Sequence, residues 1–156
     1  MDQKKRFVNM MNRRAQELMA NGTHFMNPHG LHDDNHYTTA YDLYLIFNEC
    51  IKHEDFVNII QSEAYTAYYT DVDGNSQEAL FTPTNLYAQG EVDVPENVTI
   101  VGGKTGTTDE AGYCLILMEK DSSDNPYISI VMGASEKPVL YEDMTSLIEA
   151  IPSGQQ

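Results

Sequence analysis

Hydrophobic periodicity changes near residue 64, and this change limits the folds that the chain can adopt. Residues 1–63 repeat apolar side chains at the spacing of amphipathic helices. Residues 64–151 instead hold short runs of aromatic and β-branched residues, typical of strands, and end in a second helical pattern. We therefore predict one α+β domain, with an antiparallel sheet flanked by helices. It divides into a helical region, 1–63, and a region of antiparallel strands plus a closing helix, 64–151.

The helical region is predicted to contain three helices. The first runs from Asp2 to Ala20, where Asn21-Gly22 stops it because both residues tolerate a left-handed cap. Turn-forming residues then predict an ordered loop, and Thr38 or Thr39 caps the second helix. The expected buried stripe of this helix comprises Leu43, Ile46, Phe47, Cys50 and Ile51. A short third helix runs from about residue 54 to residue 63.

The second region is predicted to begin with a hairpin. Asp73-Gly74 is a strong turn signal, and it separates strands at Tyr65–Thr70 and Glu78–Thr82. Three further strands are expected at 98–104, 112–120 and 127–134, the last two joined by a polar turn. The closing helix is marked by apolar residues at Leu140, Met144, Leu147, Ile148 and Ile151.

The chain is strongly acidic, which limits its partners. It holds 24 acidic and 9 basic residues, for a formal net charge of -15 at pH 7. Such a surface repels phosphate backbones and anionic lipids, so we expect no nucleic-acid partner. Beyond the basic opening segment, the only cations are Lys52, Lys104, Lys120 and Lys137. No apolar run is long enough to span a bilayer, and no signal-peptide pattern follows Met1.

One of these lysines lies in a segment with the chemistry of an anion site. Val101–Thr108 places Lys104 among glycines and threonines at the end of a predicted strand. The ammonium group attracts an anion, the threonine hydroxyls donate hydrogen bonds, and glycine lets a ligand lie against the backbone as an added strand. This predicts a carboxylate-binding strand whose candidate residues are Lys104, Thr105, Gly106 and Thr107.

The surrounding motifs resemble those of serine-type D-alanyl-D-alanine carboxypeptidases, the low-molecular-mass penicillin-binding proteins. The resemblance covers nearly all of residues 7–150. Its motifs are residues 21–25, 27–31, 36–43, 103–108, 111–115, 131–134 and 141–144. It implies the C-terminal part of the catalytic domain of a β-lactamase/transpeptidase-like fold, acting in peptidoglycan maturation outside the cytoplasm, without a cofactor.

The resemblance also implies roles for individual residues. Lys104 and Thr105 would hold the terminal carboxylate of a peptidoglycan stem peptide or a β-lactam. Gly106 would permit close approach, and the backbone of Thr107 would lie near the acyl group, where an oxyanion donor is needed.

The chain departs from the family pattern at the nucleophile. No S-x-x-K occurs in it, and its only S-x-N, Ser123-Asp124-Asn125, falls in a strand-joining turn after the K-T-G segment. Without the serine, acyl-enzyme chemistry has no first step, so this chain contains no catalytic residue and is expected to be inactive alone. Two hypotheses remain: a portion of a carboxypeptidase, or a catalytically inactive binding or assembly module. Under either hypothesis, the chain would leave a sheet edge and apolar helix faces uncovered. These surfaces favour self-association or binding of a complementing N-terminal segment.

Two other clusters contain residue types that bind metals. The histidines between residues 24 and 36 lie near Asp33 and Asp34, but no H-E-x-x-H helix supports zinc binding. The acidic residues from Asp71 to Glu78 surround Gly74, which is misplaced for a calcium loop. We therefore predict no metal site.

Cys50 and Cys114 are too few and too far apart for a metal knuckle or redox pair. We expect both to be small, buried hydrophobic side chains. The sequence is also compatible with a single disulfide between them.

Overall fold

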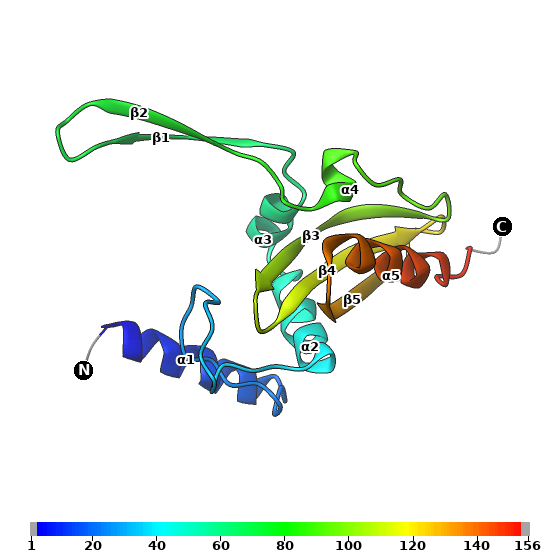
Figure 1. The fold of residues 1–156 in the computed structure, drawn as a ribbon, viewed down its shortest axis with the longest axis horizontal. Coiled ribbons are helices and arrows are strands. Elements are labelled where there is room, and N and C mark those ends of the chain that lie inside the picture. Colours follow the sequence, from blue (N-terminus) through cyan, green and yellow to red (C-terminus); the bar gives the residue numbers. More distant parts are fainter. Residues whose placement is uncertain (1–2, 154–156) are drawn as a thin grey trace.

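The computed structural model describes residues 3 to 153 and has the predicted α+β architecture (Figure 1). The helices are α1 (Gln3–Glu17), α2 (Ala40–Cys50), α3 (Glu54–Ile60), α4 (Leu86–Gln89) and α5 (Lys137–Glu149). The strands are β1 (Tyr65–Thr70), β2 (Ser76–Phe81), β3 (Val98–Thr108), β4 (Gly112–Asp121) and β5 (Pro126–Ala134). Among these residues, no helix combines the length and the hydropathy needed to cross a membrane.

The main sheet is antiparallel, with the order β3-β4-β5. Lys104 pairs with Ile116 in β4, and Ile116 pairs in turn with Ile130 in β5. A register shift interrupts the β3–β4 ladder between Ile100 and Gly102. Within residues 3–153, the outer edges of β3 and β5 pair with no further strand. The sheet therefore has two open edges.

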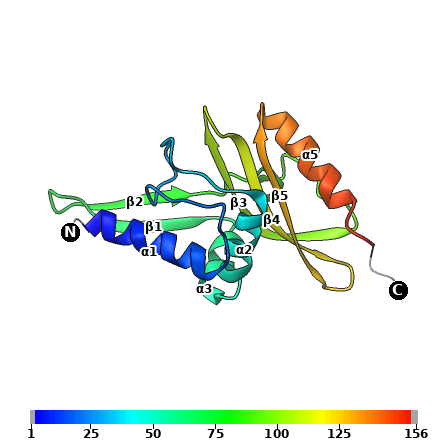
Figure 2. The same cartoon turned by 90° about the horizontal axis from the view of Figure 1, so that it is seen from below.

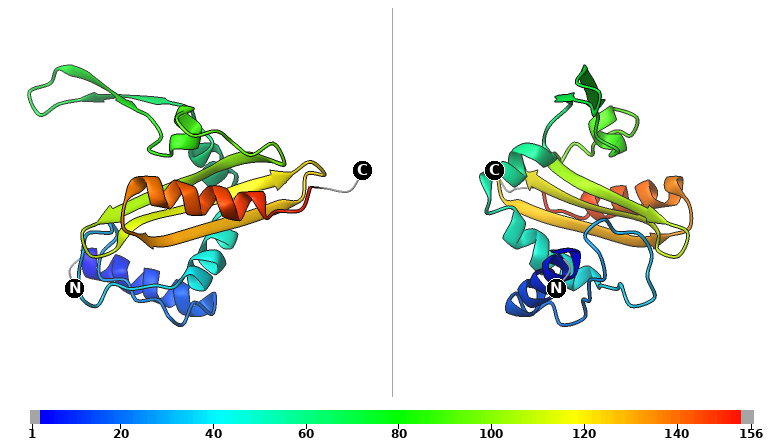
Figure 3. Two further views of the ribbon diagram at one scale, coloured as in Figure 1. Left: turned by 45° about the vertical axis from the view of Figure 1, so that its right-hand side comes forward. Right: turned by 90° about the vertical axis from the view of Figure 1, so that its left-hand side faces the viewer.

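Helix α5 covers one face of the sheet and closes the core. Leu115 and Leu117 of β4 are fully buried beneath Met144 and Ile148 of α5. Alternate residues of a strand point to opposite faces, so Ile116 and its neighbours in alternation face away from α5. On that side α3 packs against β3: a Cβ added to Gly102 would lie 2.3 Å from the carbonyl oxygen of Ile60. Figures 2 and 3 show α5 on one side of the sheet and the α2–α3 pair on the other.

The β1–β2 hairpin projects away from the rest of the molecule (Figures 1 and 3). Its turn follows the prediction, with Gly74 at a φ of 86°. The Asp71 carboxylate accepts hydrogen bonds from the backbone N–H groups of Asp73 and Asn75 and from the side chain of Gln77. These bonds lower the pKa of Asp71, the largest contribution coming from Gln77. The acidic cluster at this position thus organises a tight turn.

Helix α1 lies apart from the sheet and is held by the loop that follows it. The Asn12 side chain bonds both the carbonyl and the N–H of Phe25, and Arg14 forms an ion pair with Glu49 of α2. The loop itself is pinned by the bridge between His24 and Tyr37. The predicted ordered loop is therefore confirmed.

Several predicted local details were wrong. The left-handed residue after α1 is Met19, not Asn21 or Gly22, because the helix already ends at Glu17. Thr39 caps α2 as predicted, but only Phe47 of the expected stripe is fully buried, since few elements cover this helix. Helix α3 ends at Ile60, three residues early, and α4 was not predicted.

Both cysteines are free and only half-buried. The single disulfide left open by the sequence is therefore absent.

Candidate functional site

The four candidate residues lie on one continuous stretch of β3. The strand runs through to Thr108, so the K-T-G segment lies inside it and not at its end as predicted. The strand extends this far because β3 stays paired with β4 up to Thr108 and Gly112, and this pairing supplies hydrogen bonds to its backbone. Because β3 is an edge strand among the described residues, its second edge is open to a ligand.

Lys104 is exposed and faces the side of the sheet away from α5. Its Nζ donates a hydrogen bond to the carbonyl of Thr105. Of the other lysines beyond the opening segment, Lys52 is ion-paired with Glu49 and Lys120 with Asp124. No ion pair found among residues 3–153 includes Lys104. Its charge is therefore available to an anion.

Thr105 has a partner that the sequence reasoning missed. Its hydroxyl is hydrogen-bonded to the hydroxyl of Thr84, which precedes α4. If Thr84 donates in this bond, the Thr105 hydroxyl keeps its own proton for a ligand oxygen. No local sequence signal connects residues 21 positions apart, so only the fold brings them together.

The glycines of β3 differ in what surrounds them. A side chain at Gly102 or Gly103 would collide with backbone atoms, at 2.3 Å from the Ile60 carbonyl and 2.2 Å from the Ile116 carbonyl respectively. At Gly106 an added Cβ would meet no atom within 4 Å. Packing thus explains Gly102 and Gly103, whereas Gly106 leaves free space along the strand. Thr107, opposite Tyr113, is exposed beside this space.

Two structures border this stretch of β3. At the Lys104 end, α3, the base of the hairpin and α4 enclose a cavity of about 700 Å³ that Lys104 itself lines. At the other end, His32 of the loop before α2 lies 3.7 Å from the Glu110 carboxylate in the β3–β4 turn. The candidate strand therefore runs between a cavity and a loop.

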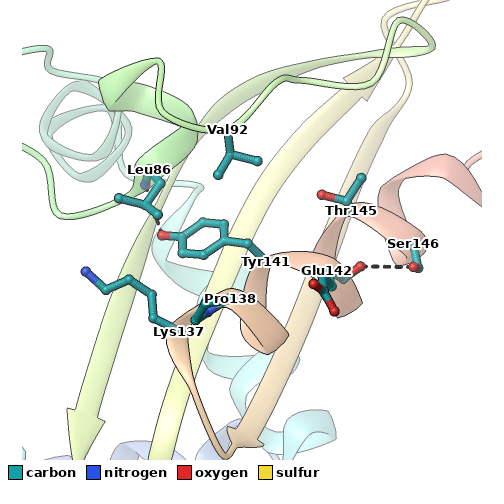
Figure 4. A pocket seen from close by; sticks show the side chains of 8 residues that line it. All are labelled: Leu86, Val92, Lys137, Pro138, Tyr141, Glu142, Thr145 and Ser146. Carbon is teal, nitrogen blue, oxygen red and sulfur yellow. Dashed lines mark hydrogen bonds between the residues drawn. The ribbon is translucent and has the colours of Figure 1, made fainter.

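A second cavity, of about 600 Å³, lies between α5 and the segment around α4 (Figure 4). The hydroxyl of Tyr141 points to Leu86 and accepts a hydrogen bond from its backbone N–H at 2.9 Å. The phenol of Tyr87 bonds the Thr145 hydroxyl at 2.7 Å. These bonds fix α4 to α5 and thereby hold Thr84 beside Thr105.

The remaining sequence motifs lie elsewhere. Ser123-Asp124-Asn125 is in the β4–β5 turn, where the Asp121 carboxylate accepts bonds from the N–H groups of Ser123 and Asn125. These bonds, chiefly those from Asn125, lower the pKa of Asp121. Across residues 3–153, no three His, Cys, Asp or Glu side chains come together as a possible metal site.

One unusual residue, Glu119, was not predicted. It lies on the α5 face of β4, its side chain is fully buried, and neither carboxylate oxygen has a hydrogen-bond partner. Burial raises the pKa of Glu119 to about 7. The sequence contained a signal for this burial. Leu115, Leu117 and Glu119 are two positions apart, so their side chains lie on the same face of the strand.

A family model of D-alanyl-D-alanine carboxypeptidases matches residues 2–136 of the chain. The chain belongs to this family. It is 30% identical over 143 residues to D-alanyl-D-alanine carboxypeptidase DacF of Bacillus subtilis, covering 92% of this chain and 34% of that protein. It is 31% identical over 127 residues to DacA of Haemophilus influenzae, covering 81% of this chain and 29% of that protein.

The fold of this family member is also found among solved structures. The crystal structure of a Streptomyces DD-transpeptidase superposes with a TM-score of 0.82 at 26% identity, covering 93% of this chain and 53% of that one. The chain thus spans about a third of the curated relatives and half of the transpeptidase. The predicted fold class and family resemblance are confirmed.

Proposed function

We propose that this chain is the substrate-binding C-terminal portion of a D-alanyl-D-alanine carboxypeptidase that acts on peptidoglycan stem peptides outside the cytoplasmic membrane. The observation that carries the proposal is Lys104, an exposed lysine without an ion-pair partner among the described residues, on an edge strand. Its ammonium and the Thr105 hydroxyl bind the terminal carboxylate of the peptide. The space beside Gly106 lets the peptide approach the strand.

The acyl-transfer step needs a nucleophile from outside this sequence. The chain holds no S-x-x-K, so a serine and lysine from an upstream segment complete the site. With that segment in place, the Thr107 backbone contributes to the oxyanion hole. A β-lactam then acylates the serine, with its carboxylate on Lys104.

Two surfaces of the chain suit this complementing segment. Within residues 3–153 the outer edge of β5 is unpaired and can accept a further strand. Large apolar side chains are also exposed on the helical layer, including Phe7, Met10 and Tyr41. Exposed apolar surface of this extent favours association, so the chain alone is expected to self-associate.

Intact-mass analysis after incubation with penicillin tests the catalytic part of the proposal. The 156-residue chain should show no mass shift, whereas a longer chain with the upstream segment should gain the mass of one penicillin. A covalent adduct on the shorter chain would contradict the missing-nucleophile argument. No adduct on the longer chain would favour the inactive binding module instead.

Binding of N-acetyl-D-Ala-D-Ala, followed by NMR titration of the chain, tests the carboxylate site. Lys104→Ala should weaken binding about tenfold or more, since a hydrogen bond to a charged group contributes about 1.5–3 kcal/mol. Lys137→Ala removes a lysine that also lacks an ion pair among the described residues but lines the other cavity, and should have no effect. Equal affinities for both variants would refute the role of Lys104.

A further inference from the structure

The β1–β2 hairpin is a two-stranded sheet with two open edges. It projects from the rest of the molecule, and within residues 3–153 neither of its strands pairs with a third (Figures 1 and 3). A two-stranded hairpin is marginally stable in water unless a further strand or a packed face supports it. This hairpin instead exposes large apolar side chains on both faces: Tyr65, Tyr68, Tyr69, Leu80 and Phe81. A further strand along one edge would therefore stabilise it.

The two strands of the hairpin differ in charge. All six residues of β1 are tyrosine, threonine or alanine, so the strand contains no charge, no proline and no glycine. Edge strands normally carry a charge or a proline that blocks pairing with another chain, and β1 has neither. In contrast, β2 contains Glu78. Because the whole chain has a net charge of -15, two copies can approach each other most readily along the uncharged edge of β1.

A hydrogen bond at the turn indicates which backbone groups of β1 face this open edge. The Asp71 N–H donates to the Asn75 carbonyl, and these two residues continue the register of the β1–β2 ladder. Hydrogen-bonded and non-hydrogen-bonded pairs alternate along an antiparallel ladder. Thr66, Tyr68 and Thr70 each lie an odd number of residues before Asp71. Their N–H and C=O groups therefore point away from β2 and are free to bond another strand.

We infer that β1 pairs antiparallel with β1 of a second copy of this chain, about a two-fold axis at Tyr68, to form a four-stranded sheet. In this register Tyr68 lies opposite the second copy's Tyr68, and Thr66 lies opposite the second copy's Thr70. Every residue of β1 with outward backbone groups is then paired. Aromatic pairs and threonine pairs at opposed positions both stabilise a sheet. The inference does not depend on the proposed function, because no residue of the K-T-G strand takes part.

The same arrangement on β2 is unfavourable, which assigns the contact to β1. By the same alternation, the outward backbone groups of β2 belong to Ser76, Glu78 and Leu80. A two-fold axis that pairs all three residues passes through Glu78 and places two carboxylates directly opposite each other. Like charges at opposed positions destabilise a sheet.

Disulfide cross-linking of the full chain tests the register. Tyr68→Cys and Val72→Cys are compared in a background that carries Cys50→Ser and Cys114→Ser, since both native cysteines are free. At the axis the two Cα atoms of residue 68 would be about 5.5 Å apart, within reach of a disulfide. Val72 is fully exposed at the tip of the hairpin, but its two copies would be about 26 Å apart. Tyr68→Cys should therefore form a covalent dimer under mild oxidation, and Val72→Cys should not.

Sedimentation velocity of charge variants tests whether the contact drives dimerisation. Tyr68→Lys places two ammonium groups opposite each other and should weaken dimerisation about tenfold or more, whereas Val72→Lys should leave it unchanged. Tyr68→Glu should weaken it as well. An equimolar mixture of the Tyr68→Lys and Tyr68→Glu chains should dimerise again, because opposite charges then face each other. Such a rescue would not follow if the substitutions had only unfolded the hairpin.

The outcomes that would overturn the inference are distinct. A wild-type chain that stays monomeric would contradict it. Dimerisation that Tyr68→Lys does not weaken would place the contact between copies on the helical layer instead. Equal cross-linking of Tyr68→Cys and Val72→Cys, or a mixture of the two charge variants that fails to dimerise, would refute the pairing about Tyr68.

Discussion

Replacing Glu119 by glutamine tests how a buried carboxyl group affects the stability of this sheet. The side chain is 0% exposed, between the sheet and α5, and neither of its oxygens is hydrogen-bonded. Removing the negative charge from water is costly, so burial favours the protonated form. The pKa of Glu119 is accordingly raised from 4.5 to about 7.

The raised pKa fixes the sign and size of the pH dependence. Between pH 4.5 and 7 the folded state keeps the proton that the unfolded state has lost, so the free energy of unfolding falls as pH rises. The full loss is about 3 kcal/mol, since one pKa unit corresponds to about 1.4 kcal/mol. Glutamine has nearly the same shape and cannot ionise, so Glu119→Gln should remove this loss.

Urea unfolding followed by circular dichroism, from pH 4.5 to 8, measures the effect. The difference in unfolding free energy between Glu119→Gln and wild type should rise by about 3 kcal/mol across this range in favour of the variant. The pKa of His36 is lowered, chiefly by burial, and makes stability fall on acidification, but this contribution cancels in the difference. Glu142→Gln, at an exposed carboxyl on α5, is the matched control for loss of a carboxyl group at the surface. A pH-independent difference for Glu119→Gln would refute the reasoning.

Three further predictions concern the elements that support the site. Gly102→Ala should lower the free energy of unfolding by about 2 kcal/mol or more, because its methyl group would lie 2.3 Å from the Ile60 carbonyl oxygen. Gly106→Ala should change the free energy of unfolding by under about 0.5 kcal/mol, because an added Cβ there meets no atom within 4 Å. Urea titrations of the pair check this, and equal losses would contradict it. Tyr141→Phe should cost about 1–3 kcal/mol by leaving the Leu86 N–H without its acceptor, and the Leu86 amide should then exchange faster with deuterium; unchanged exchange would count against that bond's role. Thr39→Ala should cost about 1 kcal/mol through loss of the α2 cap, while Thr39→Ser should restore most of it, as thermal unfolding can show.

Local chemistry made some elements predictable from the sequence. The cap at Thr39 and the turn at Asp73-Gly74 depend on neighbouring residues, and both were placed correctly. The extension of β3 to Thr108 was missed because glycine is depleted in strands, which outweighed the strand preference of the neighbouring threonines. The strand continues there because β4 supplies hydrogen bonds, which is a tertiary effect that local patterns do not contain.

The candidate site likewise contains residues that a local motif predicts and contacts that only the fold creates. Lys104, Thr105, Gly106 and Thr107 could be proposed from a short motif, because one strand carries them all. The contact between Thr84 and Thr105, and the cavity wall of Tyr65 and Phe81, depend on how distant segments meet. Glu119 was missed for another reason: a charged residue in a strand normally faces solvent, and here the core holds it instead.

The anchoring of α4 by Tyr141 has a consequence for how the protein is synthesised. The segment bearing Thr84 leaves the ribosome first, and the phenol hydroxyl that accepts a hydrogen bond from the Leu86 amide emerges 55 residues after that amide. A nascent chain interrupted before residue 137 would contain the whole K-T-G strand without the helix that steadies its neighbour. The binding strand can therefore reach its working geometry only after α5 has been synthesised.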